Sequence, residues 1–486
     1  MIEWMKRLKI NLNLIILLYL YIPILVFLFG WIKWYIAIGA TIMFLMALNE
    51  LRKENQVTYI KIHTYKGVIA LLLSMLFLMI WCIFSGQGAY VSQAGDWGKH
   101  NVLLEDLIHY EWPVRYDLKD GGIMDYYIAG YLLPALIGKI YGGVNTAEFI
   151  LLIWVCAGLL LTCISIYVYL GCKSEWKLLL ICGVLVTFST FIVPLSGLYR
   201  ILCPEDVGDG YHWLSSSIRI QYSSNIILLR WVFPQFVPTI VAVIGLLLNR
   251  NQIGSWGIFC APIVLYSTFC FVGIVALVLE FIVVDWFLAI DKKRFASKLL
   301  GWGNLYSVVV ALVLCIYILG NVLQPKPDSV AMKFSLIDYS GHEVLWIVFQ
   351  MSWILWCLIL IKKESKNHLL YCSGIILFLL PFGSLGIWND FVMRCSIPAL
   401  FVLCILVTKN VVDIENERFY KNLLIGCLVL NVFGGGNELM LALKSSGMQE
   451  DNRWKYASSE EFLLGEYGWQ YVNWDEKNSI VQWVLK

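Results

Sequence analysis

The sequence predicts an all-α, polytopic membrane protein with about thirteen transmembrane helices and one long outer loop. Of its 486 residues, 60% are hydrophobic and only 14% are charged, whereas soluble domains are roughly half apolar and a quarter charged. This composition excludes a soluble fold, and the net charge of +2 gives no sign of a nucleic-acid partner. The 21 Trp and 26 Tyr suit side chains that anchor helix ends at the membrane surface.

Apolar windows of membrane-spanning length divide most of the chain. The stretch 254–290 is too long for one helix, so we expect a break near Phe271. The apolar segment 125–143 is broken by Pro134 and carries Lys139, and we expect it to lie at the surface or to re-enter. The predicted spans are 13–29, 31–48, 67–85, 147–170, 176–194, 232–249, 254–270, 272–290, 303–323, 343–361, 368–384, 393–408 and 420–437.

The distribution of Lys and Arg predicts the orientation. With the N-terminus in the cytoplasm, the inner segments are short and rich in these residues, as in 292–298, and the longer outer segments are poorer in them. We therefore predict a membrane domain over 1–437, with outer loops near 86–146 and 195–231, and a short outer-face tail over 438–486 that ends outside. Most of the fourteen Cys lie in apolar runs without CxxC spacing, which is typical of buried thiols.

The first outer loop holds the densest group of ionisable residues. If a helix begins near Asp96, then Asp96, Lys99 and His100 share one face of it. The carboxylate could be a general base toward a hydroxyl, and Lys99 or His100 could bind phosphate. Asp96 could equally be a helix N-cap. We expect Glu105 and Asp106, further along the same helix, to form a solvated face.

Two arginines lie where a predicted outer loop meets a predicted span. Arg230 precedes the span 232–249, and Arg394 lies with Asp390 at the start of 393–408. An Arg at the outer leaflet suits a lipid-linked phosphate. Alternatively, Arg394 pairs with Asp390 one helical turn away; we favour phosphate binding.

Other acidic residues leave alternatives open. Asp206 and Asp209, beside Gly208 and Gly210, could coordinate a divalent cation, although Asp-Gly is also a turn signature, which we favour. For Asp285 and its neighbour Glu280, either the span 272–290 is drawn wrongly or both face a polar cavity. The sequence has no G-x-S-x-G, Walker, H-E-x-x-H or Rossmann pattern, which argues against a serine hydrolase and an ATP-driven pump.

Three stretches resemble the GT-C class, the multi-span glycosyltransferases that use polyprenyl-linked sugars. They are Gly95-Asp96-Trp97-Gly98-Lys99-His100-Asn101, Tyr131-Leu132-Leu133-Pro134-Ala135-Leu136-Ile137-Gly138-Lys139 and Asn389-Asp390-Phe391-Val392-Met393-Arg394. The chain departs from the usual pattern in having two spans rather than one before the loop, and it has no large soluble C-terminal domain.

The resemblance implies a GT-C-like fold and an enzyme of cell-envelope glycan biosynthesis in a bacterial plasma membrane. Asp96 would be the catalytic base, and the donor would contact a set of residues on the outer loops and span ends. The donor would be a polyprenyl-phosphate-linked sugar and the acceptor a hydroxyl of a glycan, lipid or protein; no cofactor is implied, although a divalent cation is compatible. The predicted substrate-binding residues are Lys99, His100, Arg115, Arg230, Asp390 and Arg394.

Two other functions fit the same features. A transporter or flippase of lipid-linked glycans would place ionisable residues near mid-bilayer, where only Glu280 and Asp285 are candidates. A polymerase or ligase of lipid-linked glycans would also need a large outer loop and outer arginines. The aromatic tail, with Trp469, Tyr471 and Trp474, could bind a glycan or pack on the membrane; we favour packing.

Overall fold

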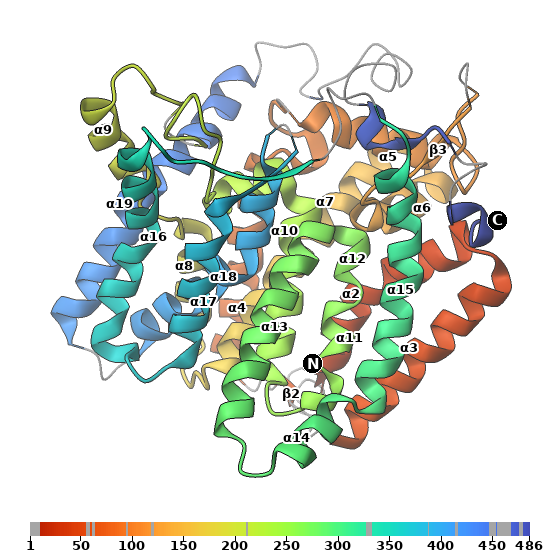
Figure 1. Cartoon of the computed structure of the whole chain (residues 1–486), viewed down its shortest axis with the longest axis horizontal. Helices are drawn as coiled ribbons and strands as arrows, with labels where there is room; N and C mark the ends of the chain where they lie inside the picture. Colours follow the sequence, from red (N-terminus) through yellow and green to blue (C-terminus); the bar gives the residue numbers. More distant parts are fainter. Residues whose placement is uncertain are drawn as a thin grey trace.

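The computed structural model is an all-α membrane protein (Figure 1). Its ribbon shows two ends: the long loops gather at one, with α5, β3 and the C-terminus, and short turns and α14 lie at the other. We call these the loop end and the turn end. The residues described are 10–54, 59–60, 64–93, 96–117, 121–209, 212–326, 333–386, 388–413, 417–446, 453, 468–475 and 480–486.

Eleven helical stretches in these ranges are long and apolar enough to cross a membrane. Two of them are pairs, α8 (Lys177–Thr187) with α9 (Ile192–Leu202) and α14 (Lys292–Leu299) with α15 (Trp302–Leu323). The other nine are single helices: α2 (Leu12–Trp31), α3 (Trp34–Glu54), α4 (Tyr65–Phe84), α7 (Gly143–Tyr169), α10 (Asn225–Leu248), α13 (Thr268–Leu288), α16 (Glu343–Glu364), α18 (Asp390–Val412) and α19 (Arg418–Ser445).

The remaining two predicted spans hold shorter apolar helices. In 254–270 the chain forms α11 (Gly257–Cys260) and α12 (Ile263–Tyr266), because Pro262 between them has no N–H to donate to the preceding turn. In 368–384 the helix α17 (His368–Leu379) is about 18 Å long and gives way to a 3-10 turn that contains Pro381. The predicted break near Phe271 lies at Ser267, which caps α13 by accepting a hydrogen bond from the N–H of Cys270 at 3.2 Å.

Short elements complete the loop end. Two helices follow α4, namely α5 (Trp97–His109) and α6 (Ala129–Tyr141); α6, the predicted surface or re-entrant segment, has only 13 residues, too few to cross a bilayer. All strands are short and antiparallel: β1 (Ile10–Asn11) pairs with β2 (Tyr59–Ile60), β3 (Ile123–Met124) with β6 (Val472–Asn473), and β4 (Phe334–Leu336) with β5 (Gly383–Leu385). The pairing of β3 with β6 holds the tail against the first loop, and α19 runs past residue 437 to Ser445.

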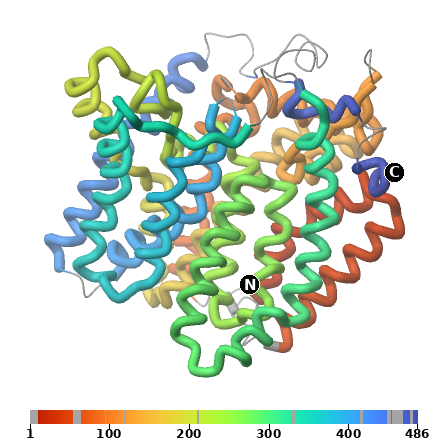
Figure 2. Tube along the Cα trace, viewed as in Figure 1, coloured from red at the N-terminus to blue at the C-terminus, as the bar shows by residue number. Residues whose placement is uncertain are grey.

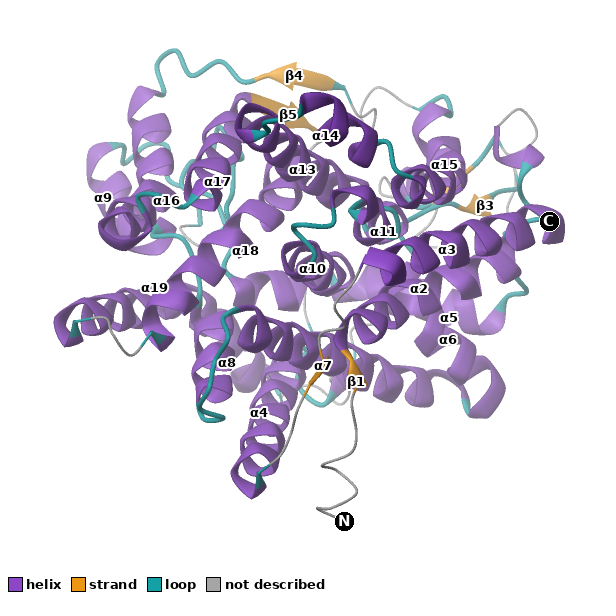
Figure 3. Cartoon of the chain, turned by 90° about the horizontal axis from the view of Figure 1, so that it is seen from below, coloured by secondary structure: helices purple, strands orange, loops and turns teal. Residues whose placement is uncertain are grey.

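Helices α10 and α18 form the centre of the bundle. Buried residues make up 89% of the most apolar part of α10 and 94% of that of α18, and the two helices contact each other. The view along the bundle places α10 near the middle (Figure 3). A helix that is apolar on every side is buried rather than half-exposed, so these two helices are the frame on which the loop end is built. The Cα trace in Figure 2 shows the surrounding helices running between the same two ends.

A break in α10 shapes the loop end. Val232 has φ −138° and ψ 34°, outside the helical region, and Pro234 follows it. Gly130 of α6 packs directly on this break, because a Cβ on Gly130 would lie 2.8 Å from the Cβ and 3.1 Å from the Cα of Pro234. The absence of a side chain at Gly130 therefore lets α6 touch α10.

This contact gives a test of the packing. Gly130→Ala should lower the apparent melting temperature of the purified protein, because the added methyl must push α6 away from α10; overpacking of this kind costs about 1–3 kcal/mol. Gly183→Ala in α8 is the matched control, since a Cβ there meets nothing within 4 Å, and it should leave stability unchanged or raise it by up to about 1 kcal/mol. Equal melting temperatures for the two variants would contradict the close α6–α10 contact.

Candidate functional site

A cavity of about 600 Å³ opens at the loop end, and we call it the Asp96 cavity. Four of the predicted site residues line it: Asp96, Lys99, Asp390 and Arg394. They come from α5 and α18, far apart in sequence. The remaining wall is largely aromatic and polar, and it consists of Tyr126, Asp209, His212, Trp213, Gln221, Ile227, Trp231, Val232, Trp388, Met393, Glu438, Gln470 and Tyr471.

Asp96 and Lys99 form an ion pair on the first turn of α5. Asp96 occupies the N-cap position of α5, but its side chain makes no capping hydrogen bond and accepts from the Lys99 ammonium instead. The predicted shared face is therefore confirmed for Asp96 and Lys99 but not for His100, and of the two alternatives for Asp96 the geometry does not support capping. Its side chain keeps 36% of its surface open, toward the cavity.

The electrostatics keep both members of this pair charged. Burial raises the pKa of the Asp96 carboxyl, but the nearby Lys99 ammonium outweighs it, with a further contribution from Arg394, so the pKa lies below its ordinary value. Burial lowers the pKa of Lys99, and the Asp96 carboxylate reverses this, so the pKa is raised. Asp96 is thus an ionised carboxylate at neutral pH.

His100 lies behind the cavity wall rather than in it. Its side chain is 2% exposed; Nε2 donates to the carbonyl oxygen of Trp231 at 3.0 Å, and Nδ1 then accepts from the Tyr131 hydroxyl. Burial, with the Lys99 charge next, lowers the pKa of His100 to about 3. A neutral imidazole with both nitrogens engaged cannot bind phosphate as predicted; it ties α5 to α6 and α10.

Asp390 and Arg394 form the second ion pair of the cavity. Arg394 Nη2 lies 2.9 Å from Asp390 Oδ2 across one helical turn, so the structure shows the i,i+4 pairing, which is the less favoured alternative in the sequence-based prediction. Arg394 is buried, and its Nε has no hydrogen-bond partner among the described residues. Asn389 begins this turn with a left-handed φ of 51°, a conformation that Asn tolerates, and its side chain donates to the carbonyl of Arg219 at 3.0 Å.

The structure does not bring Arg230 and Arg115 into the cavity. Arg230 is buried behind it, with Nε 3.5 Å from a carboxylate oxygen of Glu438, and Glu438 itself lines the cavity. Arg115 lies near the C-terminus, where it donates to the carbonyl of Lys486 at 2.9 Å. Contact of either arginine with a ligand in the Asp96 cavity would therefore require a rearrangement.

Aromatic side chains from three distant parts of the chain also line the cavity, and only Tyr471 among them is named in the sequence analysis. Trp213 and Trp388 stack with ring centroids 5.8 Å apart, and the Arg219 guanidinium lies 3.9 Å from the Trp388 ring centroid. Tyr471, from the tail, is buried in the wall. The prediction that the tail packs on the membrane is wrong for Tyr471; its partners are brought to it by the β3–β6 pairing, which no local pattern predicts.

The Asp206 carboxylate organises the second outer loop between α9 and α10. Asp206 accepts hydrogen bonds from the hydroxyls of Ser215, Ser217 and Tyr199 at 2.6–2.8 Å. Burial raises its pKa, and these hydrogen bonds more than reverse the effect, so the pKa lies well below the ordinary value. Within the described residues, no group of three or more His, Cys, Asp and Glu could hold a metal ion.

Asp106 corrects a prediction about α5. It is 2% exposed and accepts a hydrogen bond from the Tyr116 hydroxyl at 2.9 Å, so it is not on a solvated face. Glu105 pairs with Arg453 at 2.7 Å. The helix is therefore held on both sides, and the position of Asp96 and Lys99 at its start is fixed.

The buried neutral state of His100 predicts a pH dependence of stability. In the unfolded chain a histidine binds a proton near pH 6.5, and in the folded protein His100 does so only near 3. Its contribution is thus complete above pH 6.5 and is lost as the pH falls toward 3. Between pH 7 and 5, the melting temperature of wild type should fall more than that of His100→Gln, whereas His109→Gln, at an exposed position of α5, should follow wild type. Parallel curves for all three proteins would contradict a neutral His100.

Comparison of the chain with protein-family models, with curated proteins and with solved structures finds no match. The function is therefore inferred from the side chains that line the cavity and from the helices that carry them.

Proposed function

We propose that the protein is a membrane glycosyltransferase that moves a sugar from a polyprenyl-phosphate donor to an acceptor hydroxyl in the Asp96 cavity. One observation carries the proposal: an ionised carboxylate, Asp96, lies in one cavity with two cations, Lys99 and Arg394, that can hold a phosphate. Chemistry of this kind needs a base at the acceptor and positive charge at the leaving group.

In the proposed reaction, the acceptor oxygen forms a bond to the anomeric carbon while the bond from that carbon to the phosphate oxygen breaks. The electron pair of the broken bond leaves with the polyprenyl phosphate. The hydroxyl proton passes to the Asp96 carboxylate, which is ionised before the reaction because Lys99 lies beside it. No nucleotide and no redox partner are needed for this balance.

The two ion pairs supply the donor phosphate with cations that are already in place. Lys99 is neutralised by Asp96 and Arg394 by Asp390, so neither cation is buried unpaired. A phosphate bound between them would compete for both cations. Drawing Lys99 toward the phosphate would also loosen its hold on Asp96 and make the carboxylate a stronger base.

The size and lining of the Asp96 cavity suit a sugar phosphate. A volume of about 600 Å³ lies within the usual range for small-molecule sites, about 300–1,000 Å³. The side chains of Trp213, Trp231 and Trp388 line the cavity beside polar groups. A hexose has an apolar C–H face and a polar rim, and such a wall is complementary to it.

An adjoining hollow gives the lipid tail of the donor a place. A cavity of about 70 Å³ shares Tyr126, Asp390 and Arg394 with the Asp96 cavity. Its other walls include Phe269 of α13 and Ile318 and Val322 of α15, and Val322 is 48% exposed on the outside of the bundle. We infer that the prenyl chain passes between α13 and α15 into the surrounding lipid while the phosphate reaches Arg394.

A polymerase or ligase that takes a longer lipid-linked glycan would use the same groups and remains the second candidate, because the mouth of the cavity faces the loop end. A transporter is less well supported. Between the Asp96 cavity and the turn end, α10 over 233–246 and α18 over 395–408 carry no charged residue, and both stretches are almost wholly buried. A polar glycan would have to cross this apolar centre.

Asp96→Asn should abolish product formation, because the amide cannot accept the proton; loss of a general base typically costs 10²–10⁴-fold in rate. Glycan and glycolipid profiles of cells that produce the variant and wild type at equal membrane levels measure the effect. Glu111→Gln, an exposed carboxylate after the same helix, is the matched control and should retain the product. A product present at wild-type level in the Asp96→Asn cells would overturn the proposed role.

Lys99→Gln tests whether Lys99 lowers the pKa of the catalytic base Asp96. Without the ammonium, Asp96 loses the largest contribution that lowers its pKa while burial still raises it, so the pKa should rise and the acid limb of kcat/KM should move to higher pH, by about 1 unit or more. Membranes assayed for the product identified by profiling give this curve. Lys66→Gln, at an exposed position near the turn end, should leave the limb in place. An unshifted limb in Lys99→Gln would show that Asp96 does not titrate in the rate-limiting step.

A further inference from the structure

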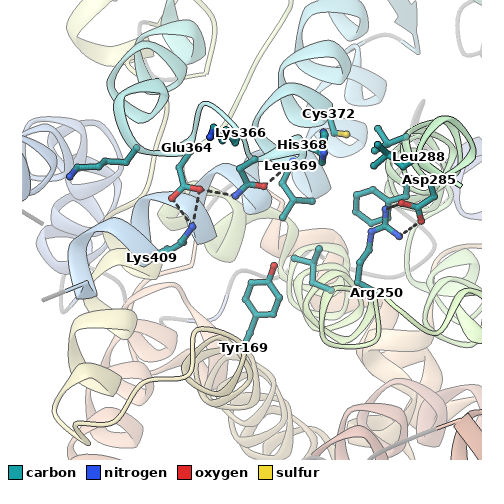
Figure 4. Close-up of a pocket in the computed structure, with 15 residues that line it drawn as sticks. Tyr169, Arg250, Asp285, Leu288, Glu364, Lys366, His368, Leu369, Cys372 and Lys409 are labelled. Carbon is teal, nitrogen blue, oxygen red and sulfur yellow. Dashed lines mark hydrogen bonds and ion pairs between the residues drawn. The ribbon is translucent and has the colours of Figure 1, made fainter. Parts of the chain in front are cut away.

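A second cavity, of about 490 Å³, lies at the turn end of the bundle, opposite the Asp96 cavity, and we call it the Arg250 cavity (Figure 4). It lies among the ends of α7, α10, α13, α16, α17 and α18. Its ionisable lining residues are four permanent cations, one histidine and two acids: Arg250, Lys363, Lys366, Lys409, His368, Asp285 and Glu364. The lining therefore has an excess of positive charge.

Both acids of the Arg250 cavity are already engaged. Asp285 accepts two parallel hydrogen bonds from Arg250, at 2.6 and 2.8 Å. Glu364 is 3% exposed and accepts from Lys409 at 2.9 Å, from Asn410 at 2.9 Å and from Asn367 at 2.7 Å. The two pairs lie on opposite sides of the cavity, with Leu369 and Tyr169 between them (Figure 4). The alternative that Glu280 and Asp285 face a polar cavity is thus confirmed for Asp285, whereas Glu280 does not line the Arg250 cavity.

Two lysines supply the excess charge. Lys363 and Lys366 are exposed, and neither forms an ion pair with the acids that the structure describes. Two aromatic rings also hold the Arg250 side chain in place. Its guanidinium lies 4.2 Å from the Phe281 ring centroid and 4.9 Å from that of Trp256. A concave site with fixed and free cations on its rim attracts an anion with several acceptor oxygens.

The apolar part of the lining indicates where this anion comes from. Val284 and Leu288 of α13 and Leu369 of α17 border the cavity, and Leu288 is 64% exposed. Further along α17, Ile375 and Leu379 are more than half exposed. Cations at the level of the helix ends, with exposed apolar side chains leading away from them, match the two parts of a phospholipid.

We propose that the Arg250 cavity binds a phosphate group, supplied by the headgroup of an anionic phospholipid whose acyl chains lie along α13 and α17. The turn end is the one that the density of Lys and Arg assigns to the cytoplasm, where anionic lipids attract basic pockets between helices. The bound phosphate joins α10 and α18 through Arg250 and Lys409, so the lipid stabilises the two central helices.

The test uses the full-length protein in nanodiscs of phosphatidylcholine with and without phosphatidylglycerol. Phosphatidylglycerol should raise the apparent melting temperature, as any ligand of the folded state does, and native mass spectrometry should find it retained. Lys363→Gln with Lys366→Gln should weaken retention roughly tenfold or more, since each lysine near an anionic lipid surface adds to the attraction. Lys292→Gln with Lys293→Gln makes the same charge change in α14 at the same end and should have little effect.

A second arm distinguishes lipid from free phosphate. Inorganic phosphate or ADP, added to protein in phosphatidylcholine nanodiscs, should give no saturable stabilisation if the headgroup is the source. If either compound stabilises the wild type saturably and the Lys363/Lys366 variant loses this effect, the phosphate site stands and its ligand is a soluble phosphate. Equal effects of phosphatidylglycerol on the Lys363/Lys366 and Lys292/Lys293 variants, without any phosphate or ADP effect, would overturn the proposal.

Discussion

The break in α10 is the constraint on which the loop end depends. Pro234 has no N–H for the carbonyl of Arg230, and Val232 leaves the helical conformation, so buried backbone acceptors need other donors. His100 meets this need at the carbonyl of Trp231. The hydrogen bond fixes α5 against α10, and the first turn of α5 then places Asp96 and Lys99 on the same cavity as Arg394 of α18. A helix break that would otherwise cost stability thus positions the candidate site.

The charges of the loop end are arranged so that no cation is buried alone. Asp96 pairs with Lys99, Asp390 with Arg394, and Glu438 with Arg230. This balance avoids the cost of an isolated buried charge, which would be very large. It also couples ligand binding to reactivity: an incoming phosphate that draws Lys99 away raises the basicity of Asp96. The same ion pair can therefore protect the free protein and prepare the base in the complex.

The sequence predicted those features that depend on residues close together in the chain. Apolar windows became helices, and the i,i+3 and i,i+4 spacings of Asp96 with Lys99 and of Asp390 with Arg394 became ion pairs. The role of His100 could not be predicted, because its acceptor is 131 residues away and is available only through the bend at Val232. The position of Tyr471 in the cavity wall could not be predicted either, since a two-residue strand pairing brings it to the first loop. Long-range backbone partners leave no periodic trace in the sequence.

The two cavities share helices but not a path. Trp231 near the start of α10 lines one cavity, and Arg250 just after its end lines the other; Arg394 and Lys409 stand in the same relation on α18. Uncharged, buried turns of both helices separate them. Near the turn end, Asn249 and Asn13 exchange hydrogen bonds at 2.8 and 3.0 Å, which fixes α10 to α2. Any influence of a ligand in the Arg250 cavity on the Asp96 cavity must therefore pass through the position or stability of α10 and α18 as rigid elements, and not through a polar channel between the two sites.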